Sequence, residues 1–354
     1  MIMRLAGGSI STRHAYLMIT GAGRAGSGGK WVVRWCGWAH RGRMAERITT
    51  RIVWRDLPER VRASVEEIIG DRVVEAVSQP GGYSPGTADR VRTATGRRAF
   101  VKAVSPAQNP DSPVMHRAEA RNAAALPASA PTPRLLGCYD DGEWVALVFS
   151  DVDGRHPVTP WHTDELCRVL AALEAMAAAL TPSPAAHVPT AAERLAGDFA
   201  GWHRIAADPP ERLDPWIRAH LDDLRAAADQ GIAALTGDTL CHVDVRADNL
   251  LVDATGTVTV VDWPWACRGP AWLDSALLLV NVRLHGGHDT EALLRRLPLT
   301  AGVDPAVLTG FYAGLAGFFT DGARRPPPPG IPTVRAFQQA QADALLPWLA
   351  DRLR

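Results

Sequence analysis

The segment from residue 240 to residue 262 carries the side chains of this chain that are best suited to chemistry. In order, it holds His242, Asp244, Asn249 and Asp262. An asparagine oxygen and a carboxylate are hard ligands that suit magnesium, which takes a few protein oxygens and completes its coordination with substrate phosphates. Asp244 adds a second carboxylate from the polar loop before Asn249. The segment therefore predicts a magnesium site that engages phosphate groups.

The local pattern around these residues predicts a β-hairpin that positions them. Residues 249–253 and 258–262 are short, apolar, β-prone runs, and the intervening Ala-Thr-Gly supplies the turn. Antiparallel pairing of the two runs would bring Asn249 and Asp262 side by side at the open end of the hairpin.

Each of these residues also has an ordinary structural interpretation, as a solvated carboxylate, a turn residue or a hydrogen-bonded core histidine. The combined pattern is more specific than its parts. His242-x-Asp244-x-x-x-x-Asn249, followed thirteen residues later by Asp262-Trp263 after a strand, resembles the catalytic and metal-binding segments of the aminoglycoside phosphotransferase family. That family is related to the protein kinases.

A second feature is the scarcity of lysine. Of the 38 basic residues, only Lys30 and Lys102 are lysines. In such a background a retained lysine marks a place where a compact ammonium is needed in place of a guanidinium. Lys102 lies in a predicted strand, residues 99–104, that closely follows the glycine-rich segment 80–86. A glycine-rich turn lets backbone N–H groups approach phosphate oxygens.

Length and composition set wider bounds. The 354 residues, 47% hydrophobic and 21% charged, are typical of a soluble globular protein with one large or two moderate domains. No apolar run is long enough to predict a transmembrane helix, so we expect no membrane association. Five cysteines without regular spacing argue against a zinc site or a disulfide framework and favour the cytoplasm.

Charge is distributed unevenly. Residues 1–43 contain seven Lys or Arg and no Asp or Glu, so the remaining chain is net acidic. A net acidic body disfavours nucleic-acid binding. The N-terminal segment is interpreted as a flexible arm, a targeting segment or, preferentially, an over-extended start before Met44. Its GxGxxG match at residues 21–26 lacks a flanking strand and helix and is not taken as a nucleotide site.

The element pattern predicts an α+β fold with two lobes. A helix before Gly70, with Asp56 as its N-cap, precedes predicted strands at residues 73–78, 88–95, 99–104, 134–139 and 144–149, with one main helix at 112–126. Strand periodicity ends at a hinge near residues 150–154, and the rest is predicted as helical apart from the hairpin. The predicted divisions are an arm at 1–43, an N-terminal ATP-binding lobe with an antiparallel sheet at 44–150, and a mainly helical catalytic lobe at 151–354.

The order of these parts resembles the protein-kinase-like fold over residues 71 to about 285, and this resemblance implies roles for particular residues. ATP would lie under the glycine-rich turn, against Gly81, Gly82, Ser84 and Gly86, with its adenine against Val148 and Asp151. Lys102, oriented by Glu119, would hold the α and β phosphates. Asn249 and Asp262 would bind Mg²⁺, and Asp244 would accept or orient the proton of the attacking hydroxyl. His242 and Asp274 would brace the loop, and Arg246 would contact phosphate or substrate.

Departures from the family pattern narrow the function. Val243 stands where the family usually has glycine. Protein-kinase segments expected after Asp262 are absent, which favours a small-molecule kinase over a protein kinase. The acceptor, a hydroxylated small molecule, stays open between an aminoglycoside, another antibiotic, a sugar and a similar metabolite. Trp263, Trp265 and Trp272 are interpreted either as a stacking wall for it or, for at least two of them, as core residues.

Two alternatives to an active kinase remain. One is a nucleotide-binding pseudokinase or scaffold without phosphotransfer, and the other is a binding protein that uses the same fold without ATP. The protein is expected to be a monomer or a weak homodimer.

Overall fold

The computed structural model describes residues 51–79 and 84–354. The interpretations of the N-terminal segment, and those of Gly81 and Gly82, therefore lie outside the described residues. Residues 51–150 are called the N-terminal region below, and residues 151–354 the C-terminal region.

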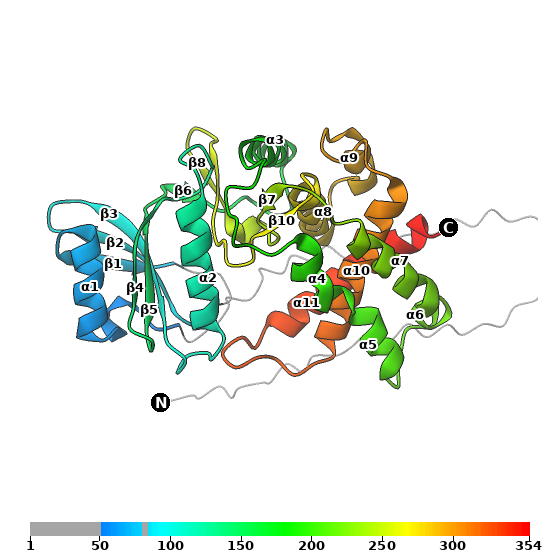
Figure 1. The fold of residues 1–354 in the computed structure, drawn as a ribbon, viewed down its shortest axis with the longest axis horizontal. Coiled ribbons are helices and arrows are strands. Elements are labelled where there is room, and N and C mark those ends of the chain that lie inside the picture. Colours follow the sequence, from blue (N-terminus) through cyan, green and yellow to red (C-terminus); the bar gives the residue numbers. More distant parts are fainter. Residues whose placement is uncertain (1–50, 80–83) are drawn as a thin grey trace, which may run out of the picture. The chain divides into compact units, whose positions relative to one another are not determined.

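The N-terminal region is built on a five-stranded antiparallel sheet (Figure 1). Its strands are β1 (Val73–Ser78), β2 (Thr87–Thr93), β3 (Arg98–Val104), β4 (Leu135–Asp140) and β5 (Val145–Ser150), in the spatial order β1-β2-β3-β5-β4. The five strands expected from the sequence are all present. In the register of β3 with β5, Lys102 lies opposite Leu147.

Two helices cover opposite faces of this sheet. On one face, α1 (Glu59–Ile69) buries Val61, Val65 and Ile69 against the sheet, and Gly70 ends the helix with a φ of 78°. Asp56 is not the N-cap expected for α1. It ends a short 3₁₀ turn, η1 (Trp54–Asp56), and its carboxylate accepts from the Val53 N–H. Pro58 occupies the N-cap position of α1 instead.

The other face of the sheet packs against α2 (Ser112–Ala125), so the sheet lies between α1 and α2 (Figure 1). Side chains alternate along β3 and β5, so Phe100, Lys102 and Phe149 point toward the α2 side. This alternation places Lys102 near Glu119, in the middle of α2.

The C-terminal region is mainly helical and contains the larger core. Its helices are α3 (Thr163–Ala179), α4 (Ala191–Phe199), α5 (Gly201–Ala207), α6 (Pro215–Ala219), α7 (Leu221–Ala233), α8 (Leu273–His285), α9 (Thr290–Arg296), α10 (Pro305–Ala323) and α11 (Val334–Arg352). The helical chain is interrupted near residues 200 and 220, where a single residue separates α4 from α5 and α6 from α7.

Short strands also occur beyond the hinge, contrary to the expectation that the hairpin would be the only β-structure there. The hairpin itself pairs β8 (Leu250–Asp253) with β9 (Val258–Val260), and β6 (Gly154–Arg155) adds to its edge. A separate pair joins β7 (Thr239–Cys241) to β10 (Cys267–Gly269). Strands of two to four residues are too short to show a period of two in the sequence.

Helix α10 runs through the middle of the helical core, in close contact with α5, α7 and α11. A Cβ atom added to Gly231 of α7 would lie 2.2 Å from the carbonyl carbon of Gly310 of α10. Glycine is therefore required at this crossing, because any side chain would push the two helices apart. The glycines of α10 lower its helix propensity but permit this packing.

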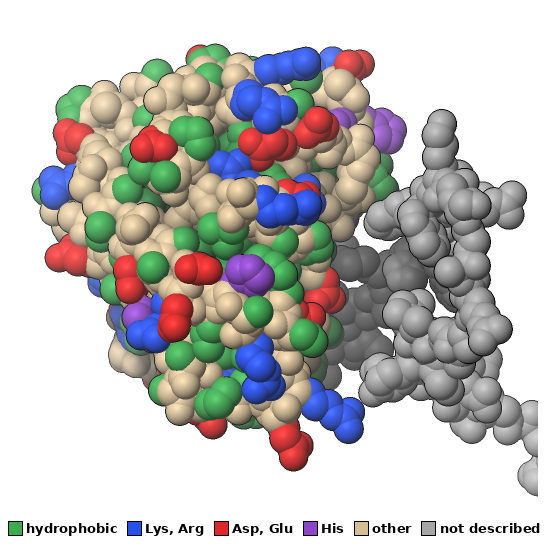
Figure 2. Space-filling model, turned by 90° about the vertical axis from the view of Figure 1, so that its right-hand side faces the viewer, with side chains coloured by type: hydrophobic (Ala, Val, Ile, Leu, Met, Phe, Trp, Pro, Cys, Tyr) green, Lys and Arg blue, Asp and Glu red, His purple; other side chains and the backbone are tan. Residues whose placement is uncertain are grey.

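Within the described residues, no helix is both long and apolar enough to cross a membrane. On the face shown in Figure 2, acidic and basic side chains are interspersed and hydrophobic side chains are scattered between them. The four cysteines that the structure describes are unpaired (Cys138, Cys167, Cys241 and Cys267).

Candidate active site

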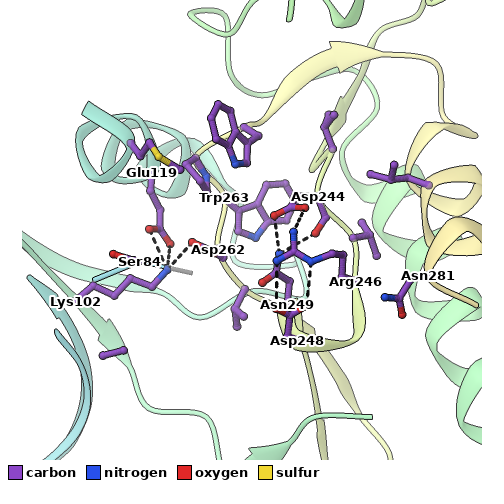
Figure 3. A pocket seen from close by; sticks show the side chains of 18 of the residues that line it. Ser84, Lys102, Glu119, Asp244, Arg246, Asp248, Asn249, Asp262, Trp263 and Asn281 are labelled. Carbon is purple, nitrogen blue, oxygen red and sulfur yellow. Dashed lines mark hydrogen bonds and ion pairs between the residues drawn. The ribbon is translucent and has the colours of Figure 1, made fainter. Parts of the chain in front are cut away.

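A cleft of about 620 Å³ is lined by residues of both regions. The N-terminal region contributes β3, α2 and the end of β5. The C-terminal region contributes the loop at residues 243–249, the segment 261–265 and side chains of α4, α8, α10 and α11. Figure 3 shows the centre of the cleft, where residues from both regions meet.

The Lys102 ammonium forms ion pairs with two carboxylates in this cleft (Figure 3). Its Nζ lies 2.7 Å from Oε1 of Glu119 and 2.8 Å from Oδ1 of Asp262. The Glu119 side chain is almost fully buried, at 4% exposure, whereas that of Asp262 is 41% exposed. The expected pair between Lys102 and Glu119 is thus present, and Asp262 completes a three-residue cluster.

The electrostatics of this cluster are set by burial and by the central cation. Burial favours the neutral amine, but the Asp262 and Glu119 carboxylates outweigh it and raise the pKa of Lys102. Burial raises the pKa of Glu119, and Lys102 opposes that rise only in part. At Asp262 the attraction of Lys102 exceeds the effect of burial, so its pKa is lowered. Asp262 is therefore the more acidic of the two carboxyl groups that pair with Lys102.

Asp244 lies beside the cluster at the start of the 244–249 loop (Figure 3). Its carboxylate accepts a hydrogen bond of 3.0 Å from Nδ2 of Asn249 and forms an ion pair with Arg246. Arg246 also donates from Nε to Asp248, at 3.0 Å. Its guanidinium lies 5.7 Å from the ring centroid of Phe337, on α11. Arg246 thus links both carboxylates of the loop to the wall of the cleft.

Burial raises the pKa of Asp244 to about 6, Arg246 opposes the rise, and the nearby Asp262 adds to it. A carboxyl group with such a pKa is ionised at neutral pH yet is a stronger base than a solvated aspartate. It can accept or orient a hydroxyl proton.

The start of this loop is held by Asp274, at the beginning of α8. The two oxygens of its buried carboxylate accept from the backbone N–H groups of His242 and Val243, at 2.8 and 2.9 Å. His242 uses both ring nitrogens: Nδ1 accepts from the Asp244 N–H and Nε2 donates to the carbonyl of Val261. The imidazole therefore connects the loop to the hairpin and has no nitrogen left for proton transfer.

Val243 adopts a φ of 66°, in the left-handed region. This conformation is unfavourable by roughly 1–2 kcal/mol for a β-branched residue, whereas glycine adopts it at almost no cost. The positive φ explains why the family that this segment resembles usually has glycine at this position. Two hydrogen bonds, from the Val243 N–H and its neighbour to Asp274, hold the strained conformation.

Two oxygens in the cleft have the chemistry of magnesium ligands. Oδ1 of Asp262 faces Lys102 and Nδ2 of Asn249 faces Asp244, which leaves Oδ2 of Asp262 and the amide oxygen of Asn249 without a hydrogen bond from any described residue. The hairpin brings them close, since the Val261 N–H donates to the Asn249 carbonyl. A carboxylate and an amide oxygen fit Mg²⁺ when phosphates supply further ligands.

Of the residues in the N-terminal region that were expected to contact the nucleotide, some line the cleft and others do not. Ser84 lines the cleft. Gly86 does not, and its lack of a side chain has a packing reason, because a Cβ there would lie 2.4 Å from the carbonyl oxygen of Ala103. Asp151 lines the cleft with its carboxylate held in ion pairs of 2.7 Å by Arg90 and Arg98.

Val148 differs from expectation. Its side chain is fully buried on the α1 face of the sheet, because alternation along β5 turns Phe149 toward the cleft. The Val148 side chain therefore faces away from the cleft, and the contact of the adenine with residues 148–151 stays a prediction.

The sequence matches the model of the phosphotransferase enzyme family over residues 80–309. This chain belongs to that family. It is accordingly a kinase of the small-molecule type, with the protein-kinase-like fold expected from its motifs. No curated protein matches the chain in sequence.

Solved structures support the same fold. One is a thermostable mutant of aminoglycoside phosphotransferase APH(4)-Ia in a ternary complex with ADP and hygromycin B, at 17% identity and a TM-score of 0.54 over 80% of this chain and 97% of that chain. Another is spectinomycin phosphotransferase APH(9)-Ia with ADP and spectinomycin, at 12% identity and 0.52 over 84% and 94%. A choline/ethanolamine kinase family protein from Mesorhizobium loti matches at 16% identity and 0.53 over 83% and 94%.

The structure adds residues of this phosphotransferase that the sequence did not single out. Asn122, one turn after Glu119 on α2, is buried and donates to the carbonyl of Trp263, next to Asp262. His116, one turn before Glu119, lines the cleft with an Nε2 atom that has no hydrogen-bond partner among the described residues, and burial lowers its pKa to about 4. Their spacing of three from Glu119 was the available signal, because residues three apart share a helix face.

The tryptophans divide between the core and the cleft. Trp263 and Trp272 are 2% and 8% exposed, so the expectation that at least two of the three are core residues is confirmed. Trp265 is 38% exposed and lines the cleft.

Proposed function

We propose that this chain transfers the γ-phosphate of ATP to a hydroxyl group of a small molecule. One observation carries the proposal: Lys102 holds Glu119 and Asp262 together, and Asp262 lies beside the loop that presents Asp244 and Asn249. Phosphoryl transfer requires neutralised phosphate charge and an aligned acceptor more than a strong nucleophile. These five side chains provide both functions within one cleft.

Each side chain has a role that follows from its charge. Lys102 donates to the α and β phosphates, and Glu119 keeps the ammonium in position when the nucleotide enters. Asn249 and Asp262 would hold Mg²⁺ through the oxygens that accept no hydrogen bond from a described residue. When bound, that ion neutralises charge on the phosphates. Asp244 orients the acceptor hydroxyl and takes its proton.

His242, Asp274 and Arg246 act on these groups rather than on the substrate's reacting atoms. The first two fix the backbone around Asp244. Arg246 neutralises Asp244 and Asp248. Because it lies in the same loop as Asp244, its side chain can turn toward an incoming phosphate. Binding of ADP and of antibiotic substrates by similar structures, which their descriptions state for hygromycin B and spectinomycin, supports a nucleotide and an acceptor sharing this cleft.

The proposal is tested with purified protein, Mg-ATP and a panel of hydroxylated small molecules. We expect Mg-ATP to raise the melting temperature by ligand linkage, and Lys102→Ala to abolish that rise. ADP formation with an acceptor should fall at least 100-fold in Asp244→Asn and in Asp262→Asn. Asp222→Asn is the matched control, because this carboxylate is exposed on α7, outside the cleft.

The same experiment separates the kinase from its alternatives. A pseudokinase is stabilised by Mg-ATP but forms no ADP or phosphorylated product with any acceptor. A binding protein that uses no ATP shows neither stabilisation nor turnover. Either outcome would overturn the proposed function.

A further inference from the structure

The cleft continues beyond Asp244, on the side away from Lys102, into a chamber with apolar walls. In Figure 3, Asn281 of α8 marks this side. The walls come from α8, α10 and α11, which contribute no charged side chain to the described lining of the cleft. The aromatic and aliphatic side chains that form the chamber include Leu277, Phe311, Leu315, Phe318 and Phe337.

Helix α4 supplies the charged side chains of this part of the cleft. They are Arg194 and Asp198, one turn apart and of opposite sign. Arg194 lies over the exposed ring of Trp265, 5.8 Å from its centroid. The Asp198 carboxylate has no hydrogen bond or ion pair with a described residue, and burial raises its pKa to about 6.

The carboxylates near the centre of the cleft already form ion pairs with cationic side chains of the protein. Asp244 and Asp248 pair with Arg246, and Asp262 pairs with Lys102. A molecule with several ammonium groups needs a carboxylate or several acceptors for each, because an ammonium desolvated against an apolar wall without a partner is strongly unfavourable. Among the described residues that line the chamber, Asp198 is the one such partner.

The polar groups that α8 and α11 add to the described lining are uncharged amides: Asn281 on α8, and Gln338 and Gln341 on α11. Asn281 is 5% exposed, and its Oδ1 accepts from Nε1 of Trp161 at 3.2 Å. This bond orients the amide so that Nδ2, which has no partner among the described residues, faces the cleft. Apolar walls with a few neutral polar groups are typical of sites for largely uncharged ligands.

From these contacts we propose that the acceptor is a hydroxylated molecule with an extended apolar body and at most one basic amine. The apolar body lies against α8, α10 and α11, its hydroxyl reaches Asp244, and Asn281 donates to an oxygen of the body. This inference rests on the proposed phosphotransfer and narrows its acceptor to a class distinct from polycationic aminoglycosides.

Calorimetric titration tests the acceptor class without requiring turnover. The protein is loaded with Mg-AMP-PNP and titrated with three probes: octyl β-D-glucoside below its critical micelle concentration, D-glucose, and the polycation kanamycin. We expect octyl glucoside to bind at least tenfold more tightly than glucose, since the two differ only in the apolar chain. We expect kanamycin to bind more weakly than octyl glucoside. Equal binding of octyl glucoside and glucose, no binding of either, or preferred binding of kanamycin would each overturn the inference.

Two variants locate the binding. Trp265→Ala removes an exposed wall residue, so we expect octyl glucoside to bind at least fivefold more weakly. Phe318→Asp adds a carboxylate to the wall and should weaken octyl glucoside while strengthening kanamycin. Trp216→Ala is the control, because this indole stacks on His220 and does not line the cleft. Unchanged octyl glucoside binding in both wall variants contradicts the assignment.

Failure of this inference is distinguishable from failure of the proposed function. If Mg-ATP stabilises the protein and Lys102→Ala abolishes the effect, nucleotide binding stands whatever the probes show. A preference for kanamycin in that protein would then refute the apolar acceptor alone.

Discussion

The Nζ atom of Lys102 lies 2.8 Å from Oδ1 of Asp262, although 160 residues separate them in the chain. This ion pair joins the sheet of the N-terminal region to the hairpin of the C-terminal region. Glu119 contacts the same ammonium from α2. The cation therefore neutralises two carboxylates that would otherwise repel each other across the cleft.

The ammonium of Lys102 cannot be replaced by a guanidinium. Its side chain is 16% exposed and fits between two carboxylates, and arginine is larger and planar. We expect both Lys102→Arg and Lys102→Met to lower kcat at least 100-fold. Lys102→Met should also lower the free energy of unfolding by about 2–4 kcal/mol, because it leaves buried carboxylates unpaired. Urea denaturation and steady-state kinetics measure the two effects.

An exposed arginine provides the comparison for this prediction. Arg92→Met removes a cation of β2 that pairs with Glu75 at the surface, and it should change stability by less than about 1 kcal/mol. If Lys102→Arg kept the kcat of the wild type, the retention of lysine at this position would have no catalytic explanation.

Loss of the Asp274 carboxylate should impair catalysis more than nucleotide binding. Asp274→Ala leaves the buried N–H groups of His242 and Val243 without acceptors and releases the strained φ of Val243. We expect the free energy of unfolding to fall by about 2–3 kcal/mol. We expect kcat to fall at least tenfold with little change in the KM for ATP, because Lys102 is on the opposite side of the cleft.

Asp289 separates this effect from destabilisation in general. Its side chain caps α9 by accepting from the Ala292 N–H, so Asp289→Ala should cost about 1 kcal/mol of stability and leave kcat unchanged. Equal loss of kcat in both variants would mean that Asp274 acts through stability alone.

The parts of the site that the sequence predicted depend on local patterns. Asp244, Asn249 and Asp262 are separated by one loop and one hairpin, so their spacing alone brings them together. Lys102 and Glu119 were predictable because a lysine on a strand and a glutamate inside the next helix resemble a known pairing. The presence of five strands in this region followed from turn residues and β-prone runs.

The acceptor chamber was not predictable for a physical reason. Its walls come from helices that are far apart in sequence, and an apolar residue such as Phe311 or Leu315 looks the same whether it faces a core or a cavity. The face of Val148 was likewise ambiguous, because β5 is apolar at almost every position and gives no alternation.

The pH dependence of turnover should report the carboxyl group of Asp244. A base must be deprotonated to act, so kcat/KM should fall about tenfold per pH unit below a pKa of about 6. Arg246 lowers this pKa, and Arg246→Gln should therefore move the acid limb to higher pH. The measurement is kcat/KM for the acceptor from pH 5 to 8 at saturating Mg-ATP. A profile that stays flat down to pH 5, or an acid limb that Arg246→Gln leaves in place, contradicts the assignment.

Asp198 should reduce the stability of the free enzyme at neutral pH. Its pKa in the folded state, about 6, is above the ordinary value of 3.8, so between these values the folded protein binds more protons than the unfolded chain. Stability therefore falls as pH rises from about 4 to 6 and stays lowered above it. Asp198→Asn removes this charge and should raise the free energy of unfolding by about 1–2 kcal/mol at pH 7.5. The gain should vanish near pH 4, where the carboxyl of the wild type is largely protonated in the folded state. Urea denaturation at both pH values measures it, with the exposed Asp222→Asn as the control that shows no gain at either. A gain of equal size at pH 4 and pH 7.5 would mean that the amide improves packing and that the buried charge is not the cause.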